Sequence, residues 1–213
     1  LFAQQLGVDR IVADVPAWDL ATLSAARNRV EKAGLHLVAL ESLPTSMYTQ
    51  TILGRAGREQ EIARVCQHIT AIGKAGIPLL SYRWSVADIG SGARLATGRG
   101  GASSTVYGMA EGGPEADAQV AADQTWQTLS YVLERVLPVA ETAGVRLAYQ
   151  AGVPAEFVPG TEFVPGWPAI LNSVAGLDRL FATFPSPNHG LDLDHGLFAW
   201  ASDRDPRQII RHL

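Results

Sequence analysis

Residues 74–84, KAGIPLLSYRW, carry the pattern that decides the fold. Gly76 separates the end of an amphipathic stretch from a short apolar run, and that run ends on the polar residues Tyr82 and Arg83. Glycine adopts the left-handed conformation that ends a helix, and the hydrophobic residue after it begins the next buried element. The segment therefore predicts a helix followed directly by a strand.

The same junction occurs twice more, as KAGL at 32–35 and TAGV at 142–145. Residues 58–75 and 123–143 carry apolar side chains at spacings of three and four, which predicts helices with one buried side. Short apolar runs predict the strands. They cover residues 10–15, 36–41, 77–84, 145–150 and 190–196.

These runs are too short for helices and too continuous for half-exposed strands, so we expect strands buried on both faces of a parallel sheet. Strands that alternate with helices define an α/β fold. Five or six such units do not close an eight-stranded barrel, which usually needs roughly 250 residues. Apparent helices at 1–6 and 205–213 end the chain. We therefore expect one domain, 1–213, that is a partial (β/α) barrel without its first and last strands, or an open sheet.

Composition excludes several classes of partner. A net charge of −4 gives no broad basic field, so we expect no nucleic acid. No apolar run reaches the roughly 18 residues that span a bilayer, and no signal peptide opens the chain, so we expect no membrane and a cytoplasmic location. The single Cys66 fits a reducing compartment. Unpaired edges of a parallel sheet predict a homo-oligomer.

Polar residues gather where the predicted strands end, and in α/β folds the ligand site lies at that edge. The segment GLDLDHG (190–196) places Asp192 and Asp194 on the same side of a strand. Their alternative role is to accept backbone hydrogen bonds or to pair with an arginine. Glu41 suits substrate hydroxyls or a metal, or a salt bridge to a neighbouring arginine. Arg83 suits a carboxylate, because its planar fork makes two parallel hydrogen bonds, or it pairs with Glu41.

Several longer segments resemble one family in order along nearly the whole chain. They are ILGRAGREQEI (52–62), KAGIPLLSYRW (74–84), GRGGA (98–102), VLPVAETAGVRLA (136–148), ILNSVAGLDRL (170–180) and SPNHGL (186–191). Together these segments resemble mannonate dehydratases, and several long matches at consistent spacing are more specific than one short motif.

The resemblance implies a TIM (β/α)8-type barrel of the xylose isomerase-like kind and a divalent metal, usually manganese. Such enzymes remove water from D-mannonate to give 2-keto-3-deoxygluconate in hexuronate breakdown. The family holds its metal with a histidine after the fifth strand and a cysteine after the sixth, followed by a histidine and an aspartate. Here Gln150 stands at the histidine position and Asp194 at the cysteine position.

We therefore predict Gln150 and Asp194 as metal ligands. An aspartate oxygen is a good ligand for Mn²⁺ or Mg²⁺, whereas a glutamine carbonyl is neutral and weak. The glycine-rich segment 88–113 is expected to be an active-site loop, and its Arg99 a substrate-binding residue. The predicted substrate-binding residues are Glu41, Tyr82, Arg83, Arg99 and Asp192. The catalytic acid and base are not predicted, and His189 is expected to be structural.

Three functions remain open. The first is a metal-dependent lyase that dehydrates a sugar acid. The second is a metal-dependent sugar isomerase or epimerase on the same barrel, because fold alone does not separate the two reactions. The third is a barrel relative that has lost the metal and only binds a sugar or a partner, which the glutamine at 150 favours.

Overall fold

The computed structural model describes residues 2–84, 94–106, 122–150 and 174–193, together with Arg207 and Arg211. Within this part of the chain, five parallel strands form one sheet in the order β1-β2-β3-β6-β7. Their bounds are β1 (Arg10–Ala13), β2 (His36–Leu40), β3 (Leu79–Tyr82), β6 (Arg146–Gln150) and β7 (His189–Asp192). The sequence predicted each of these strands, with ends that differ by a few residues.

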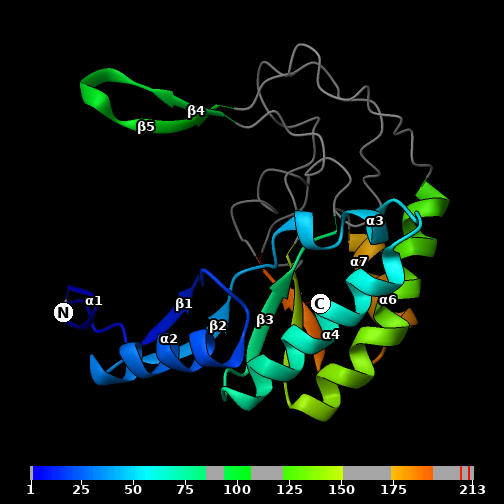
Figure 1. Cartoon of the computed structure of the whole chain (residues 1–213), viewed down its shortest axis with the longest axis horizontal. Coiled ribbons are helices and arrows are strands. Elements are labelled where there is room, and N and C mark those ends of the chain that lie inside the picture. The colour runs from blue at the N-terminus through cyan, green and yellow to red at the C-terminus, as the bar shows by residue number, and fades with distance from the viewer. Residues whose placement is uncertain are drawn as a thin grey trace.

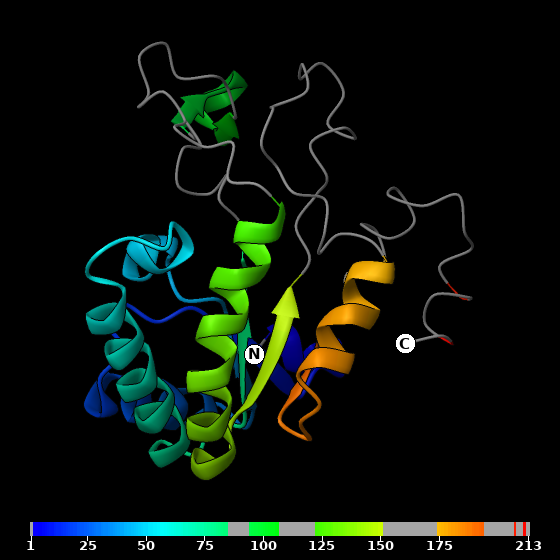
Figure 2. The ribbon, with the colours of Figure 1, turned by 90° about the vertical axis from the view of Figure 1, so that its right-hand side faces the viewer.

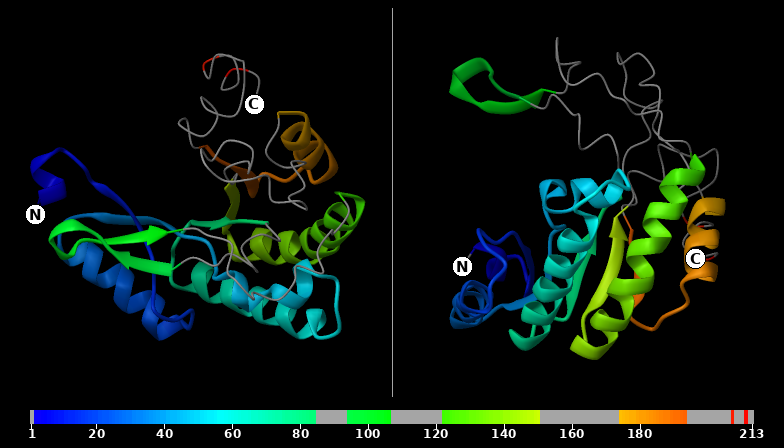
Figure 3. Two further views of the ribbon diagram at one scale, coloured as in Figure 1. Left: turned by 90° about the horizontal axis from the view of Figure 1, so that it is seen from above. Right: turned by 45° about the vertical axis from the view of Figure 1, so that its right-hand side comes forward.

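One short helix, α1 (Phe2–Gln5), precedes β1, and the other helices lie between successive strands of the chain. They are α2 (Leu20–Lys32), α3 (Thr49–Ile52), α4 (Arg58–Lys74), α6 (Ala122–Ala143) and α7 (Val174–Thr183), with short 3₁₀ turns at Thr45–Met47 and Arg99–Gly101. Helices α4 and α6 lie side by side in front of the sheet (Figure 1), and α7 lies on the far side of β6 from them (Figure 2). Seen from above, α2, α4, α6 and α7 follow one another around the outside of the sheet (Figure 3). The described strands and helices thus form an arc of a (β/α) barrel rather than a closed ring.

The three predicted junctions are confirmed. Gly34, Gly76 and Gly144 all have positive φ, between 68° and 72°. In each case the next residue's N–H donates to the carbonyl five residues back, as Ile77 does to Ile72 at 3.2 Å. This pattern satisfies the last carbonyls of the helix and turns the chain into the strand.

The two faces of the sheet differ in what covers them. Leu80 of β3 pairs with Leu147 of β6, and Tyr149 lies two residues further along β6. The three side chains therefore share one face, and they pack into the core against the helices. The intervening residues point to the other face. No described helix covers that face, the open face of the sheet (Figure 3), but exposure varies along it: Val12 of β1 is 52% exposed, whereas Ser81 and Ala148 are 3% and 5% exposed. Burial on both faces, which the sequence predicted, is therefore wrong for β1, which is an edge strand of the described sheet. In β3 and β6 the prediction is confirmed, because residues of both faces are buried.

The predicted glycine-rich loop contains a β-hairpin. Strands β4 (Arg94–Thr97) and β5 (Ser103–Val106) pair antiparallel. Gly100 and Gly101, both with positive φ, make the turn between them. The hairpin lies away from the sheet and its helices (Figure 1). The expectation of a loop is therefore wrong for residues 94–97 and 103–106. The glycine-rich composition of the segment gave no signal for two short strands.

The segment after β2 is held by a buried carboxylate. Glu61 is 6% exposed and lies in α4. Its oxygens accept hydrogen bonds from the Thr51 N–H (2.8 Å), the Thr51 hydroxyl (2.8 Å) and the Gln50 N–H (3.2 Å). Such bonds satisfy a buried charge and the free N–H groups at the start of α3. Glu61 therefore fixes the chain between β2 and α4.

Helices α4 and α6 lie close together at Gly73. A Cβ atom at this position would lie 2.9 Å from the Ala143 Cβ and closer still to the Ala143 carbonyl oxygen. The backbone of α6 cannot move aside as a flexible side chain can. Gly73 is therefore the residue that permits this helix packing. No helix in the described residues is long and apolar enough to cross a membrane.

We predict that Gly73→Ala destabilises the fold by about 1–3 kcal/mol, because the added methyl forces α4 and α6 apart. In a chain of this length, that corresponds to a fall in Tm of roughly 2–12 °C. Thermal unfolding followed by circular dichroism measures the change. Gly190→Ala is the matched control, since a Cβ there meets nothing within 4 Å. Equal Tm values for the two variants would contradict the packing argument.

Candidate functional site

The candidate site is the carboxyl edge of β3, β6 and β7 on the open face of the sheet. In the parallel ladder, Ser81 pairs with Ala148, and Gln150 pairs with Asp192. Paired residues of parallel strands point to the same face, and residues two apart share it. Ser81, Arg83, Gln150 and Asp192 are therefore brought together on one face.

Arg83 and Gln150 form the shortest polar contact of this group. The Arg83 Nε donates a hydrogen bond to the Gln150 Oε1 at 2.6 Å. Arg83 is exposed and Gln150 is half-buried. Among the described residues, neither Glu41 nor Asp192 forms a salt bridge with Arg83. The alternative in which Arg83 pairs with Glu41 is thus not what the structure shows.

Asp192 has a hydroxyl partner instead of an arginine. The Ser81 Oγ donates to the Asp192 Oδ2 at 2.9 Å, from a serine that is only 3% exposed. This bond joins β3 to β7 across β6. It holds the half-buried carboxylate at the strand ends, where its oxygens are acceptors for further donors.

Glu41 directly follows β2 and is half-buried. Its N–H donates to the Ala13 carbonyl at 3.1 Å, which extends the pairing of β1 and β2 by one residue. Leu40 pairs with Leu80, so strand alternation places Glu41 on the same face as Ser81. No salt bridge involving Glu41 is present in the described part of the chain.

Tyr82 lies on the other face, which the helices cover. Its hydroxyl is 2.8 Å from the His189 Nε2, and its ring lies against Tyr149 with 5.4 Å between centroids. The His189 Nδ1 lies 3.1 Å from the Phe184 carbonyl oxygen. A carbonyl only accepts, so Nδ1 carries the proton and Nε2 accepts from Tyr82. The structure therefore does not bring Tyr82 together with Arg83, and His189 forms structural hydrogen bonds as expected.

Burial determines the acid–base properties of this pair. It raises the pKa of Tyr82 well above its usual range, and the neighbouring Tyr149 acts in the same direction. It also lowers the pKa of His189, while the hydrogen bond to the Phe184 carbonyl partly opposes that shift. Both side chains are consequently neutral near pH 7.

The remaining predicted residues are not part of the cluster at the strand ends. Arg99 lies in the turn of the hairpin, which is separate from the sheet (Figure 1). Asp194 lies outside the described residues. The predicted convergence of Gln150 and Asp194 therefore stays a prediction.

The described residues at this edge do not fit a metal at Gln150. The only oxygen of that side chain accepts from a guanidinium. A dication on the same oxygen would lie within about 5 Å of the Arg83 charge, a repulsion of about 7 kcal/mol at an effective dielectric of about 20. Among the residues that the structure describes, no three His, Cys, Asp or Glu side chains are grouped closely enough to hold a metal ion.

Sequence reasoning missed two contributors. Ser81 shares the face of Arg83 by strand alternation, a signal that the sequence contained. Tyr48 anchors the end of β3: its hydroxyl is 3.3 Å from both the Leu43 and the Arg83 carbonyl oxygens. Its ring stacks on Trp84, with centroids 6.0 Å apart and planes 12° apart. Nothing in the sequence indicated this contact, because Tyr48 is 35 residues from Arg83.

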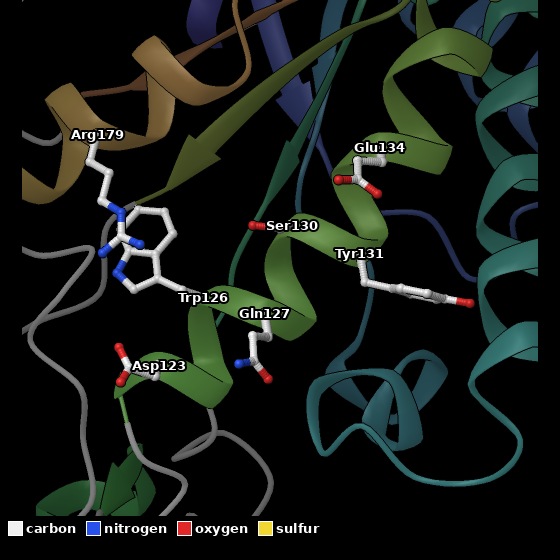
Figure 4. A pocket seen from close by; sticks show the side chains of 7 residues that line it. All are labelled: Asp123, Trp126, Gln127, Ser130, Tyr131, Glu134 and Arg179. Atoms are coloured by element: carbon white, nitrogen blue, oxygen red, sulfur yellow. The ribbon is translucent and has the colours of Figure 1, made fainter.

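A hollow of about 450 Å³ lies on the outside of α6 and α7. Figure 4 shows Arg179 of α7 beside Trp126 of α6, and Asp123 near them. The Arg179 guanidinium lies 4.2 Å from the centroid of the Trp126 ring. Its charge therefore has an aromatic partner already. The hollow is on the helix surface rather than at the strand ends, so the carboxyl edge of the sheet is the better candidate.

Comparison with known proteins decides the family. The model of the family described as "D-mannonate dehydratase (UxuA)" matches residues 3–110 and 110–213, almost the entire chain. The chain belongs to the D-mannonate dehydratase family. The mannonate dehydratase of Streptococcus equi subsp. zooepidemicus is 25% identical over 91% of this chain, and that of Shouchella clausii is 26% identical over 95%. The chain spans 59% and 63% of these relatives, respectively.

Solved structures support the same fold. The crystal structure of mannonate dehydratase from Streptococcus suis matches with a TM-score of 0.75 at 21% identity, over 97% of this chain and 62% of that one. An L-ribulose 3-epimerase matches with a TM-score of 0.61 at 18% identity, over 98% and 57%. These likenesses identify the arc of strands and helices as part of a xylose isomerase-like TIM barrel.

The buried hydrogen-bonded pair of Tyr82 and His189 should make the stability of the fold depend on pH. The pKa of His189 is lowered on folding from its ordinary value of 6.5, so the unfolded chain binds its proton more tightly. The stability that neutral His189 contributes is therefore complete above about pH 6.5 and is lost as pH falls towards the folded pKa. Urea unfolding between pH 8 and pH 5 should show a shallower decline for His189→Gln than for the wild type.

His36→Gln is the control, because His36 is exposed. It should keep the wild-type decline. A His189→Gln variant with the same pH dependence as the wild type would contradict the assignment of a buried neutral imidazole.

Proposed function

We propose that this chain belongs to a hydro-lyase that removes water from a sugar acid, with D-mannonate as substrate and 2-keto-3-deoxygluconate as product. Family membership supports the reaction, and the relatives named above are mannonate dehydratases. The observation that carries the proposal is the polar cluster on the open face at the strand ends, where (β/α) barrels bind their ligands.

The cluster suits both parts of such a substrate. A sugar acid carries one carboxylate and several hydroxyls. The Arg83 guanidinium complements the carboxylate, because its donors form a planar fork. The carboxylates of Glu41 and Asp192 are acceptors for hydroxyl donors. Opposite charges placed on one face would therefore orient the two ends of the substrate differently.

The reaction needs a base that removes the C2 proton and an acid that protonates the departing C3 hydroxyl. Loss of water leaves an enol, which becomes the 2-keto-3-deoxy acid when C3 takes up a proton. In this proposal Arg83 binds the substrate and does not transfer protons, since arginine stays protonated in proteins. The manganese and the role of Asp194 that the family resemblance implies remain predictions.

A second candidate is a sugar-binding protein without the lyase reaction. The contact that favours it is the hydrogen bond from Arg83 to the Gln150 Oε1. Gln150 stands where the family has a metal-binding histidine, and this bond uses its side-chain oxygen. Such a protein would retain the acid-binding edge and lose turnover.

The test is product formation by the purified full-length protein. D-mannonate, D-gluconate and other aldonates are incubated with the protein in Mn²⁺ and, separately, in EDTA, and 2-keto-3-deoxy acid is measured. We expect product from D-mannonate. Arg83→Ala should reduce kcat/KM about ten- to hundredfold, the size of a lost charged hydrogen bond. Arg10→Ala is the control, because Arg10 is an exposed arginine at the opposite, amino-terminal edge of the sheet.

Other outcomes separate the candidates. An isomerised or epimerised sugar without loss of water would indicate the isomerase function instead. Binding of the aldonate without any product would indicate the binding protein. Full activity of Arg83→Ala would contradict the assignment of the site to this edge.

We also propose that the protein is a homo-oligomer, since β1 and β7 each leave one edge without a strand partner in the described sheet. Size-exclusion chromatography with light scattering should give a mass of a dimer or larger. A monomer at micromolar concentration would contradict this proposal.

A further inference from the structure

The Arg83–Gln150 contact uses only one side of the guanidinium. Nε donates to the Gln150 Oε1 at 2.6 Å. The terminal nitrogens Nη1 and Nη2 have no hydrogen-bond partner among the described residues. These two nitrogens form the end of the planar fork, the geometry that receives both oxygens of a carboxylate. The bond to Gln150 therefore leaves a complete recognition edge.

The neutrality of Gln150 matters as much as its position. A carboxylate at 150 would form an ion pair with Arg83 and cancel the charge that attracts an anionic ligand. The glutamine amide oxygen accepts a hydrogen bond from Nε and leaves the full positive charge on the guanidinium. Glu41 and Asp192 lie on the same face but form no ion pair with Arg83 in the described structure.

The backbones of Gln150 and Arg83 are both held in place by neighbouring residues. Gln150 is the last residue of β6 and pairs with Asp192 in the sheet. The backbone carbonyl of Arg83 lies 3.3 Å from the Tyr48 hydroxyl. The following residue, Trp84, is 6% exposed and stacks on the Tyr48 ring. The backbone of Arg83 is thus fixed, and Gln150 restricts the remaining freedom of its side chain.

We propose that Gln150 is a positioning residue for Arg83 rather than a metal ligand, and that the pair binds the carboxylate of the substrate directly. This inference rests on the proposed function for the identity of the acid, but not for the roles of the two residues. At position 150 the resemblance to the family implies a metal ligand. In this chain the residue at that position holds the Arg83 guanidinium instead.

Gln150→Glu tests the two roles against each other, because it changes charge with almost no change in shape. If Gln150 positions Arg83, the variant forms an ion pair with it, and affinity for the sugar acid falls at least tenfold while Mn²⁺ affinity stays within twofold. If Gln150 is a metal ligand, a carboxylate is the better ligand, so Mn²⁺ binds more tightly and the sugar acid is still bound. The two roles thus predict different results in both measurements.

The measurements use the full-length protein. Calorimetry gives the affinity for D-mannonate, D-gluconate, D-glucuronate and L-lactate, and electron paramagnetic resonance of free Mn²⁺ gives the metal affinity. Gln127→Glu adds the same charge at an exposed position on α6 and should change neither value by more than twofold. Arg83→Lys keeps the charge but loses the fork, so it should weaken acid binding without changing Mn²⁺ affinity.

The failure of this inference is distinguishable from that of the proposed function. If D-mannonate does not bind but another acid does, and Gln150→Glu weakens that acid tenfold, the proposed substrate is wrong and the positioning role stands. The positioning role is overturned if Gln150→Glu tightens Mn²⁺ binding, if it leaves acid affinity unchanged, or if the wild type binds no acid of the panel.

Discussion

The parallel register of β3, β6 and β7 is the constraint on which the site depends. It aligns Ser81 with Ala148 and Gln150 with Asp192, so side chains that are distant in the sequence reach one face at one edge. The apolar residues of opposite parity pack against the helices. A shift of one residue in any of these strands would exchange the two faces, placing polar side chains in the core. The hydrophobic packing outside the arc therefore also fixes the polar cluster inside it.

Charge at this edge is arranged by hydrogen bonds between unlike groups rather than by ion pairs. Arg83 binds a neutral amide, and Asp192 binds a neutral hydroxyl. Each charged group keeps its charge for a ligand, yet each is held in position by its neutral partner. An arginine and a carboxylate bonded to each other would have lost much of that capacity. This arrangement suits a ligand that carries both an anionic end and hydroxyl donors, as a sugar acid does.

Much of the fold follows from local signals in the sequence. Glycines at 34, 76 and 144 end their helices because each adopts a positive φ, and the N–H of the apolar residue after each donates back to the helix. The hairpin around Gly100 was not predicted, because its strands are short and carry no strong alternation of apolar residues.

The site was predicted less well than the fold. Its location at the strand ends follows from the fold, but the partner of Arg83 depends on strand register, and Gln150 is 67 residues away in the chain. Tyr82 is the last residue of β3 and Arg83 follows it directly, so period-two alternation already indicated that the two side chains do not share one face. The register that brings Gln150 to Arg83 is set by packing across the sheet, which a single sequence does not display.

The most direct test of this account is a crystal structure of the full-length protein with a bound sugar acid, grown with Mn²⁺ present. The account predicts the ligand carboxylate within hydrogen-bonding distance of the Arg83 Nη1 and Nη2 atoms, with the Gln150 Oε1 still accepting from Nε. A manganese ion coordinated by the Gln150 Oε1, with the guanidinium displaced and the carboxylate on the metal, would contradict it.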